Sequence, residues 1–432
     1  MNGPPTDPFA PIRGARIAHL IESSGPGGAE RMVAELALEQ SARGCPTTVF
    51  LPEQGEEWLT AQLVGTDVAI ERYRLDTPLS PQCAREIASA FRRRRITLAH
   101  SHEFSMAVYG ACAARTVGIP HVITMHGGRY YAEKVRRRLA MRFAVASSQA
   151  TVAVSDALAA QMSEDLHVAR SQLIVIPNGV RPAMRVDSTL RDELAIPAGA
   201  PLIVAVGNLY PVKGHRYLLE ALALMETNAH VAIAGRGEGG QDLRELTANL
   251  GIADRVHLLG LRSDVPNLLG AADVFVQPSL SEGLPLAMLE AMFAGRPIVA
   301  SDVGDIQQAV GEDGALLVAP GSAQELAAAI RRLLDDRSFA GALGARAERR
   351  ALRAYGLTTM VERYAALYAP LLAEHGTEHR IERRVERRVE RRLEQRPFPM
   401  EERRTERVTE RRAERRAERR ATPAPQRPQA TR

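Results

Sequence analysis

The chain has 432 residues, of which 45% are hydrophobic and 25% charged, and its formal net charge is +5. This length allows two or three domains with apolar cores, and no apolar run approaches the ~20 residues of a membrane-spanning helix, which argues against an integral membrane protein. The N-terminus lacks the pattern of a secretory signal, and Cys45, Cys83 and Cys112 lie too far apart for a disulfide framework or a zinc site. We therefore expect a cytoplasmic protein.

The excess of positive over negative charge lies in the C-terminal segment. Residues 380–432 contain 19 Arg and 10 Glu, a net charge of +9, so the rest of the chain carries −4. The pI of the whole chain, about 9.3, is therefore no sign that the body of the protein binds nucleic acid. Residues 377–432 are predicted to form a charged, partly helical or disordered tail; self-association and anchoring to an anionic surface are the alternatives.

The first half of the chain alternates short β-type runs with helical patterns, as βαβ units do. The predicted strands are 16–21, 47–51, 97–101, 121–124, 150–154 and 173–176, and the predicted helices are 29–41, 82–94, 105–116 and 129–143.

After a hydrophilic stretch the same rhythm begins again. The predicted strands are 202–206, 230–234, 255–258, 274–277 and 297–300, and the predicted helices are 216–224, 241–250, 266–271 and 285–294. We predict two doubly wound α/β domains, 1–190 and 191–355, followed by a helix over 356–376. Ligands of such sheets bind beyond the carboxyl ends of the strands, so the cleft between the domains is the expected active site.

The segment from Ser279 to Ala291 carries two glutamates around a predicted helix start at Pro285. The backbone amides of Gly283 and Leu284 would lie at that helix N-terminus, where a pyrophosphate binds readily. Glu282 before the helix and Glu290 inside it could each hold sugar hydroxyls. The alternative is an ordinary amphipathic helix with two surface glutamates.

Three further loops follow predicted strands. Lys213, one of only two lysines, stands before a helix in the 206–214 loop, where an ammonium group suits a phosphate. Gly27 and Gly28 permit close approach of backbone to a ligand, and His126 could bond substrate hydroxyls. The alternatives are a solvated loop lysine, a tight turn without ligand, and a structural histidine.

The segment Gly235 to Gly240 matches the G-x-G-x-x-G pattern of dinucleotide-binding proteins. However, no acidic residue follows near 257–261, where it would bind a ribose. Asp-x-Asp pairs and clustered histidine ligands are also missing from the sequence, so a catalytic metal is not expected.

Taken in order, these motifs resemble those of the retaining glycosyltransferases of family 4, which have the two-domain GT-B fold. The likeness covers about residues 16–373, and its most specific part is the pair Glu282 and Glu290, which matches the family's Glu, seven residues, Glu motif. The other matching positions, in order, are Gly27-Gly28, His126, Ser155, Asn178-Gly179, Gly207 to Gly214 and Gly235.

The resemblance implies a nucleotide-diphosphate sugar in the second domain and a saccharide or lipid-linked acceptor in the first. By position, Lys213 would hold the diphosphate and Glu282 the hexose, which His126 would also contact. These three are the expected catalytic residues. The expected donor-binding residues are Gly27, Gly28, Asn208, Gly235, Arg262, Gly283, Leu284 and Glu290, with Glu290 on the ribose and Arg262 near the base. The family transfers with retention and without a metal or other cofactor.

Two positions depart from the family pattern. Asn208 stands where the family commonly has Arg, and Gly304-Asp305-Ile306-Gln307-Gln308 stands where it usually has Gly-Gly-Ile-Pro-Glu. The first change removes a positive charge beside the expected diphosphate.

The leading hypothesis is a hexosyltransferase of cell-surface polysaccharide or glycolipid synthesis. One alternative is an NAD(P)-dependent oxidoreductase that uses Gly235 to Gly240; another is a non-catalytic scaffold that binds sugar nucleotides and acts through its basic tail. The basic segment 129–143 could also lie on an anionic membrane, at the inner face of the plasma membrane, or simply be a solvated helix.

Overall fold

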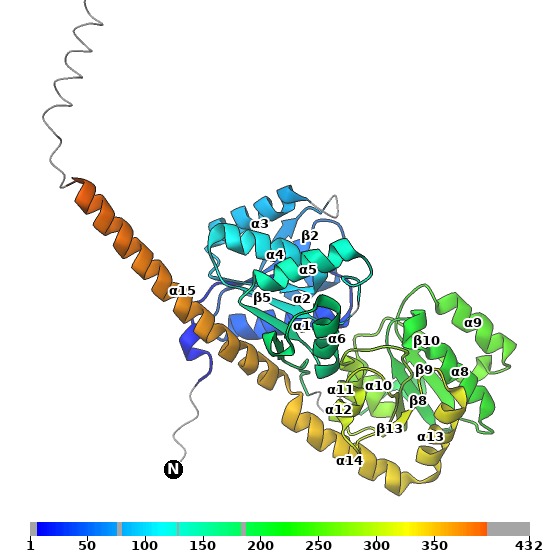
Figure 1. Cartoon of the computed structure of the whole chain (residues 1–432). Coiled ribbons are helices and arrows are strands. Elements are labelled where there is room, and N and C mark those ends of the chain that lie inside the picture. Colours follow the sequence, from blue (N-terminus) through cyan, green and yellow to red (C-terminus); the bar gives the residue numbers. More distant parts are fainter. Residues whose placement is uncertain (1–6, 76–79, 128, 183–186, 395–432) are drawn as a thin grey trace, which may run out of the picture. The chain divides into compact units, whose positions relative to one another are not determined.

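The computed structural model describes residues 7–75, 80–127, 129–182 and 187–394, with side chains as far as His375. The chain divides into a compact unit, Met1–Ala373, and a second unit, Glu374–Arg432. The compact unit contains two parallel sheets, each covered by helices on both faces (Figure 1). The doubly wound α/β class is therefore confirmed. Of the predicted tail, residues 395–432 lie outside the described residues.

The first lobe is built on a seven-stranded sheet in the order β3-β2-β1-β4-β5-β6-β7. Its central strands are buried along their length, because helices cover both faces of the sheet. The strands are β1 (Ile17–Leu20), β2 (Thr47–Pro52), β3 (Ala69–Tyr73), β4 (Leu98–His102), β5 (His121–Met125), β6 (Ala150–Ala153) and β7 (Leu173–Val175); the helices are α1 (Gly28–Ala42), α2 (Trp58–Leu63), α3 (Pro81–Arg94), α4 (Glu103–Val117), α5 (Val135–Ala146) and α6 (Asp156–Leu166).

The second lobe has a six-stranded sheet in the order β10-β9-β8-β11-β12-β13. Its strands are β8 (Leu202–Val206), β9 (His230–Ala234), β10 (Val256–Gly260), β11 (Val274–Gln277), β12 (Ile298–Ser301) and β13 (Leu316–Val318). Its helices are α7 (Leu190–Glu193), α8 (His215–Leu224), α9 (Gly240–Asn249), α10 (Val265–Ala271), α11 (Leu286–Phe293), α12 (Ile306–Val310), α13 (Ala323–Asp335) and α14 (Arg337–Ala354).

Most predicted helices and strands begin and end within one or two residues of the observed ones. The basic helix predicted over 129–143 is wrong at its start. The helix α5 begins only at Val135, after an extended Lys134. Tyr131 is fully buried and its hydroxyl donates to Asp165, so this stretch packs against the lobe instead of continuing the helix. Within the described part of the chain, no helix combines the length and the apolar character needed to cross a bilayer.

The chain passes between the lobes twice, and the two passages are hydrogen-bonded to each other. The backbone N–H of Val180 donates to Tyr355, and that of Leu357 donates to Val180, both at 2.9 Å. A Cβ on the neighbouring Gly179 would lie only 2.9 Å from the carbonyl oxygen of Gly356, so a side chain there would separate the two passages. The first passage leads into the second lobe, and the second passage leads back to the first lobe at Leu357.

After the second passage, α15 (Leu357–Glu394) packs its first turns on the first lobe. Two buried tyrosines of this helix reach polar groups at the sheet. The hydroxyl of Tyr368 lies 2.7 Å from Nδ1 of His100, and that of Tyr364 lies 3.0 Å from Oγ1 of Thr124. His100 Nε2 is itself 2.7 Å from Thr124 Oγ1, so these groups form one buried network.

We expect Tyr368→Phe to lower the free energy of unfolding by ~1–3 kcal/mol, because it leaves the buried Nδ1 of His100 without a partner. Tyr364→Phe is the matched control and should cost less, since Thr124 keeps its bond to His100. Urea denaturation followed by circular dichroism measures both. Equal losses for the two variants would contradict this account of the network.

Candidate functional site

A cleft of about 1120 Å³ lies between the two lobes, at the carboxyl ends of the strands of both sheets. Parallel strands direct the loops that follow them to a single edge, so segments far apart in sequence meet there. The structure brings all the predicted site residues into the lining of this cleft: Gly27, Gly28, His126, Asn208, Lys213, Gly235, Arg262, Glu282, Gly283, Leu284 and Glu290. Their individual roles stay predictions.

Glu282 and Lys213 form an ion pair in the cleft. The Lys213 ammonium lies 2.7 and 2.9 Å from the two carboxylate oxygens of Glu282. The Gln277 amide and the Ser279 hydroxyl also donate to Oε1 of Glu282, at 3.1 and 2.7 Å. Three donors therefore fix this carboxylate, whose side chain is only 8% exposed.

Two glycines allow these loops to approach one another. Gly214, between Lys213 and α8, has φ +66° and would place a Cβ 2.0 Å from the carbonyl oxygen of Pro278. A Cβ on Gly235 would lie 1.9 Å from the carbonyl oxygen of Gly207. Any side chain at either position would force apart the loops that line the cleft.

The N-terminus of α11 opens into the cleft beside Glu282. Pro285, where the sequence predicted the helix to start, is its N-cap, and the helix begins one residue later at Leu286. Gly283, Leu284, Leu286 and Ala287 all line the cleft at this end of the helix. Backbone N–H groups in the first turn of a helix have no intrahelical acceptor, and they attract anions.

Glu290 carries a cation partner that sequence reasoning missed. Its carboxylate is 8% exposed and lies 2.7 Å from the guanidinium of Arg31, on α1 of the other lobe. Burial raises the pKa of Glu290, and Arg31 partly opposes that shift. Arg31 follows the glycines that were predicted to approach the ligand, but nothing in the sequence indicates that it faces α11.

Arg262 also lines the cleft, held by two carboxylates. Its guanidinium lies 2.7 Å from Asp264 and 2.5 Å from Glu193. The hydrogen bonds that Arg262 donates to Asp264 and Glu193 hold the pKa of its guanidinium above the usual range. Arg262 is thus a fixed, charged part of the wall where the resemblance places the base.

Glu103 is a second residue that the sequence did not single out. It has φ +65° at the start of α4, whereas Arg95 and His167, which also have positive φ, are ordinary left-handed helix C-caps. Its carboxylate accepts the backbone N–H of His126 at 2.9 Å. Burial raises the pKa of Glu103 to about 8. Strained backbone and a buried carboxyl beside a cleft are typical of functional positions.

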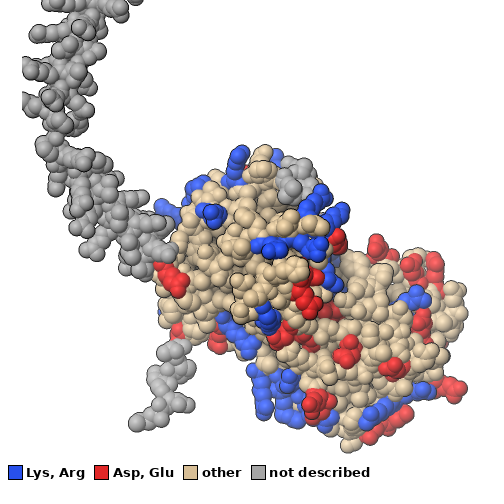
Figure 2. Space-filling view, in the orientation of Figure 1, with Lys and Arg blue, Asp and Glu red and all other residues tan. Residues whose placement is uncertain are grey.

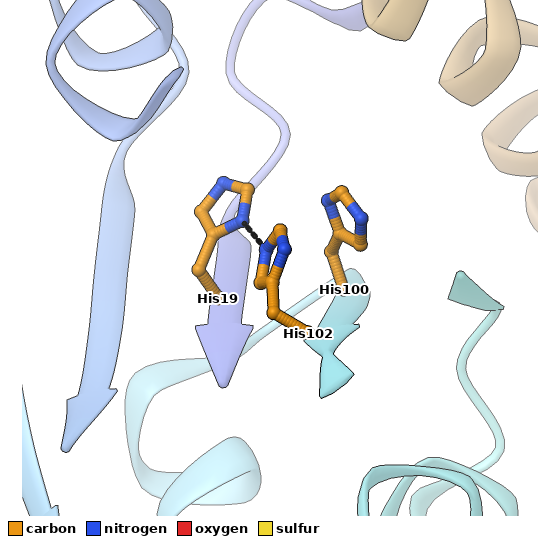
Figure 3. Close-up of side chains that lie close together, drawn as sticks. All are labelled: His19, His100 and His102. Carbon is orange, nitrogen blue, oxygen red and sulfur yellow. Dashed lines mark hydrogen bonds between the residues drawn. The ribbon is translucent and has the colours of Figure 1, made fainter. Parts of the chain in front are cut away.

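The sequence predicted no cluster of histidine ligands, and this prediction is wrong, because histidines from two strands meet in the folded chain. Figure 3 shows His19, at β1, beside His100 and His102, at β4, with a hydrogen bond between His19 and His102. Among the described residues this is the only group of three or more histidines, cysteines or carboxylates close enough to hold a metal ion. The signal in the sequence was the His-Ser-His segment at the end of a predicted strand.

The unusual Gly304-Asp305 segment joins the lobes. The carboxylate of Asp305 accepts the backbone N–H groups of Asp156 and Ala157 at 2.6 and 2.8 Å, so it binds the first turn of α6 from the opposite lobe. Ser155, which the family pattern also marks, caps the same helix through Leu158. This segment therefore has a structural role between the lobes.

Comparison with known proteins supports a single family. Residues 26–183 match the family model described as Glycosyltransferase Family 4, and residues 200–336 match that described as Glycosyl transferases group 1. The D-inositol 3-phosphate glycosyltransferase of Thermobispora bispora is 31% identical over 307 residues, which cover 63% of this chain and 70% of that protein.

Other relatives are matched over a smaller part of their length. The UDP-Gal:alpha-D-GlcNAc-diphosphoundecaprenol alpha-1,3-galactosyltransferase of Escherichia coli is 31% identical over 229 residues, which cover 49% of this chain and 59% of that protein. Across three such relatives the chain spans between 52% and 64% of their length.

A solved structure shows the same architecture. The Anabaena protein HepE, in complex with UDP-glucose, superposes with a TM-score of 0.73 at 24% identity, covering 82% of this chain and 99% of that one. The matched family models, the Thermobispora bispora relative and the shared architecture agree, and the chain belongs to glycosyltransferase family 4, with the GT-B fold.

Proposed function

We propose that this protein transfers a hexosyl group from a nucleotide-diphosphate sugar to a saccharide or lipid-linked acceptor, with retention and without a metal. The observation that carries the proposal is the cleft itself, which Lys213, Glu282 and Glu290 line together with the N-terminus of α11. The E. coli relative is named as a galactosyltransferase that uses UDP-Gal, and HepE was solved with UDP-glucose. Both names support a sugar-nucleotide donor here.

In the proposed reaction the bond from the anomeric carbon to the diphosphate breaks, and a bond to the acceptor oxygen forms on the same face. The acceptor proton passes to the departing diphosphate. Catalysis then depends on stabilising the leaving group, a task for which an ammonium group such as that of Lys213 and the free amides of a helix N-terminus are suited. Asn208 contributes no charge, but Arg31 is a further cation in the lining of the cleft.

The first prediction for the proposed function concerns the sugar-nucleotide donor. Thermal unfolding with UDP, GDP and ADP sugars, beside NAD and NADP, should show stabilisation by one sugar nucleotide, about 2.7 kcal/mol at a hundredfold excess over Kd. Glu290→Gln should weaken that binding roughly 10- to 100-fold, because a charged hydrogen bond is worth about 1.5–3 kcal/mol. Glu220→Gln on α8 is the matched control, since Glu220 pairs only with Arg216 outside the cleft.

Two other results would each support one of the alternative functions. Stabilisation by NAD or NADP alone would favour an oxidoreductase that uses Gly235 to Gly240. Sugar-nucleotide binding without transfer in any acceptor assay would favour the scaffold hypothesis.

The second prediction separates the diphosphate from the rest of the donor. Lys213→Met should weaken the nucleoside diphosphate about 10- to 100-fold by calorimetry and leave the nucleoside unchanged, because only the phosphates need the ammonium group. Lys134→Met changes the one other lysine, which lies outside the cleft, and should alter neither value. An equal loss for nucleoside and diphosphate would show that Lys213 acts only through the fold.

We further propose that the acceptor is presented at a membrane. Figure 2 shows Lys and Arg side chains over the surface of the first lobe. On α5, Val135, Leu139 and Phe143 follow at four-residue spacing and are 63%, 59% and 45% exposed. The exposed Arg136 and Arg142 lie on the same helix. An exposed apolar stripe with arginines beside it suits the surface of an anionic bilayer.

The third prediction tests this surface by liposome flotation. The protein should float with vesicles that contain anionic phospholipid and less with neutral ones, because both the arginines and the apolar stripe contribute. The double variant Leu139→Ser and Phe143→Ser should lose most of this binding. Leu352→Ser, an equally exposed leucine on α14, is the control. Equal flotation of both variants would exclude α5 as the membrane-binding surface.

A further inference from the structure

A continuous chain of side-chain hydrogen bonds leads from the interior of the first lobe to the cleft. The amide oxygen of Gln40, on α1, lies 2.8 Å from Nε2 of His19, and Nδ1 of His19 lies 3.0 Å from Nε2 of His102. Nδ1 of His102 lies 3.1 Å from Nε2 of His126, which lines the cleft. Gln40, His19 and His102 are all buried.

Burial keeps these imidazoles neutral. It lowers the pKa of His19 to about 4 and that of His126 to about 3, and it holds the pKa of His102 well below its usual value. The titratable groups around the chain are Glu103 on α4, His100 on β4, and Tyr364 and Tyr368 on α15, with Glu22 and Glu30 acting on Glu103. No cation is among the described groups that shift the pKa values of His19, His102 and His126.

Neutral rings, together with the orientation of the Gln40 amide, whose oxygen faces His19, set the direction of the bonds in the chain. An amide oxygen can only accept, so His19 must donate from Nε2, and its Nδ1 must then accept from His102. His102 in turn accepts at Nδ1 from the Nε2–H of His126. His126 therefore carries its proton on Nε2 and a lone pair on Nδ1. That Nδ1 is buried and has no partner among the described residues.

The same bonds account for the clustered histidines without a metal. Both ring nitrogens of His19 and of His102 are engaged within the chain, and those of His100 bond Tyr368 and Thr124. A metal ion would have to replace several of these bonds. A relay of neutral rings is therefore the arrangement that the distances favour.

We propose that Gln40, His19 and His102 are positioning residues that hold His126 in the Nε2–H tautomer, so that its Nδ1 accepts a hydroxyl of the donor sugar. The inference rests on the proposed function and adds a specificity to it. A lone pair at this point attracts a sugar hydroxyl and repels a carboxylate, so the site favours a neutral hexose there. An unpaired buried acceptor also costs stability until a ligand group bonds it.

The experiment uses the full chain labelled with ¹⁵N-histidine, in which long-range proton–nitrogen spectra show which ring nitrogen carries the proton. His126→Asn assigns the His126 signals. We expect an unprotonated Nδ1 on His126 in the wild type at pH 6 and at pH 8, and a mixture of tautomers in Gln40→Met, which keeps the volume but removes the acceptor. Tyr364→Phe removes a hydroxyl that bonds Thr124 and not Gln40, and it should leave the His126 tautomer unchanged.

Calorimetry with the same variants tests the consequence for binding. Gln40→Met should weaken the sugar nucleotide roughly three- to tenfold, as expected for a neutral hydrogen bond, and leave the matching nucleoside diphosphate unchanged. Tyr364→Phe should change neither affinity. A selective loss of this kind cannot come from general destabilisation.

Three results would overturn the inference: a protonated Nδ1 on wild-type His126, an unchanged tautomer and unchanged sugar affinity in Gln40→Met, or stoichiometric Zn²⁺ binding that displaces the His19 and His102 signals. Each of these leaves the proposed function standing if a sugar nucleotide binds. If the wild type binds no sugar nucleotide, the proposed function itself fails, and with it the role of His126 in holding the sugar.

Discussion

The cleft depends on the paired passages of the chain between the lobes. Val180 exchanges backbone hydrogen bonds with Tyr355 and Leu357, and Gly179 leaves no room for a side chain between the passages. Because the two passages are bonded to each other, both lobes start from one narrow junction, and the edges of the two parallel sheets open onto the same space. This junction, together with the Asp305 contacts to α6, holds the two sheets so that the loops with the charged groups meet.

Within the cleft, the charged groups satisfy one another. Lys213 bonds Glu282, and Arg31 bonds Glu290, so the two glutamates that the resemblance assigns to sugar binding already have cation partners. A diphosphate sugar would compete for these partners, since its phosphates attract the cations and its hydroxyls suit the carboxylates. Such exchange keeps buried charges paired both with and without ligand, which limits the cost of desolvation.

Much of this arrangement could be predicted because its signals are local. The strand rhythm predicted both sheets except for the edge strands β3 and β13, and it placed the 206–214 loop between a strand and a helix, where the structure has it. Partners distant in sequence could not be predicted. Arg31 and Glu290 lie on different lobes, and His19 meets His102 only because β1 and β4 are neighbours in the sheet. Local sequence patterns predict which residues lie at the carboxyl edge of a sheet, but they do not predict which of these residues contact each other.

The scarcity of lysine has a practical consequence. An amine-selective acylating reagent has only two side-chain targets, Lys213 in the cleft and the exposed Lys134 beside α5, apart from the N-terminal amine. One is three-quarters buried against a carboxylate and the other faces solvent, so they should react at different rates. The acylation pattern of this chain thus reports cleft occupancy and coverage of the α5 surface separately, without an engineered label.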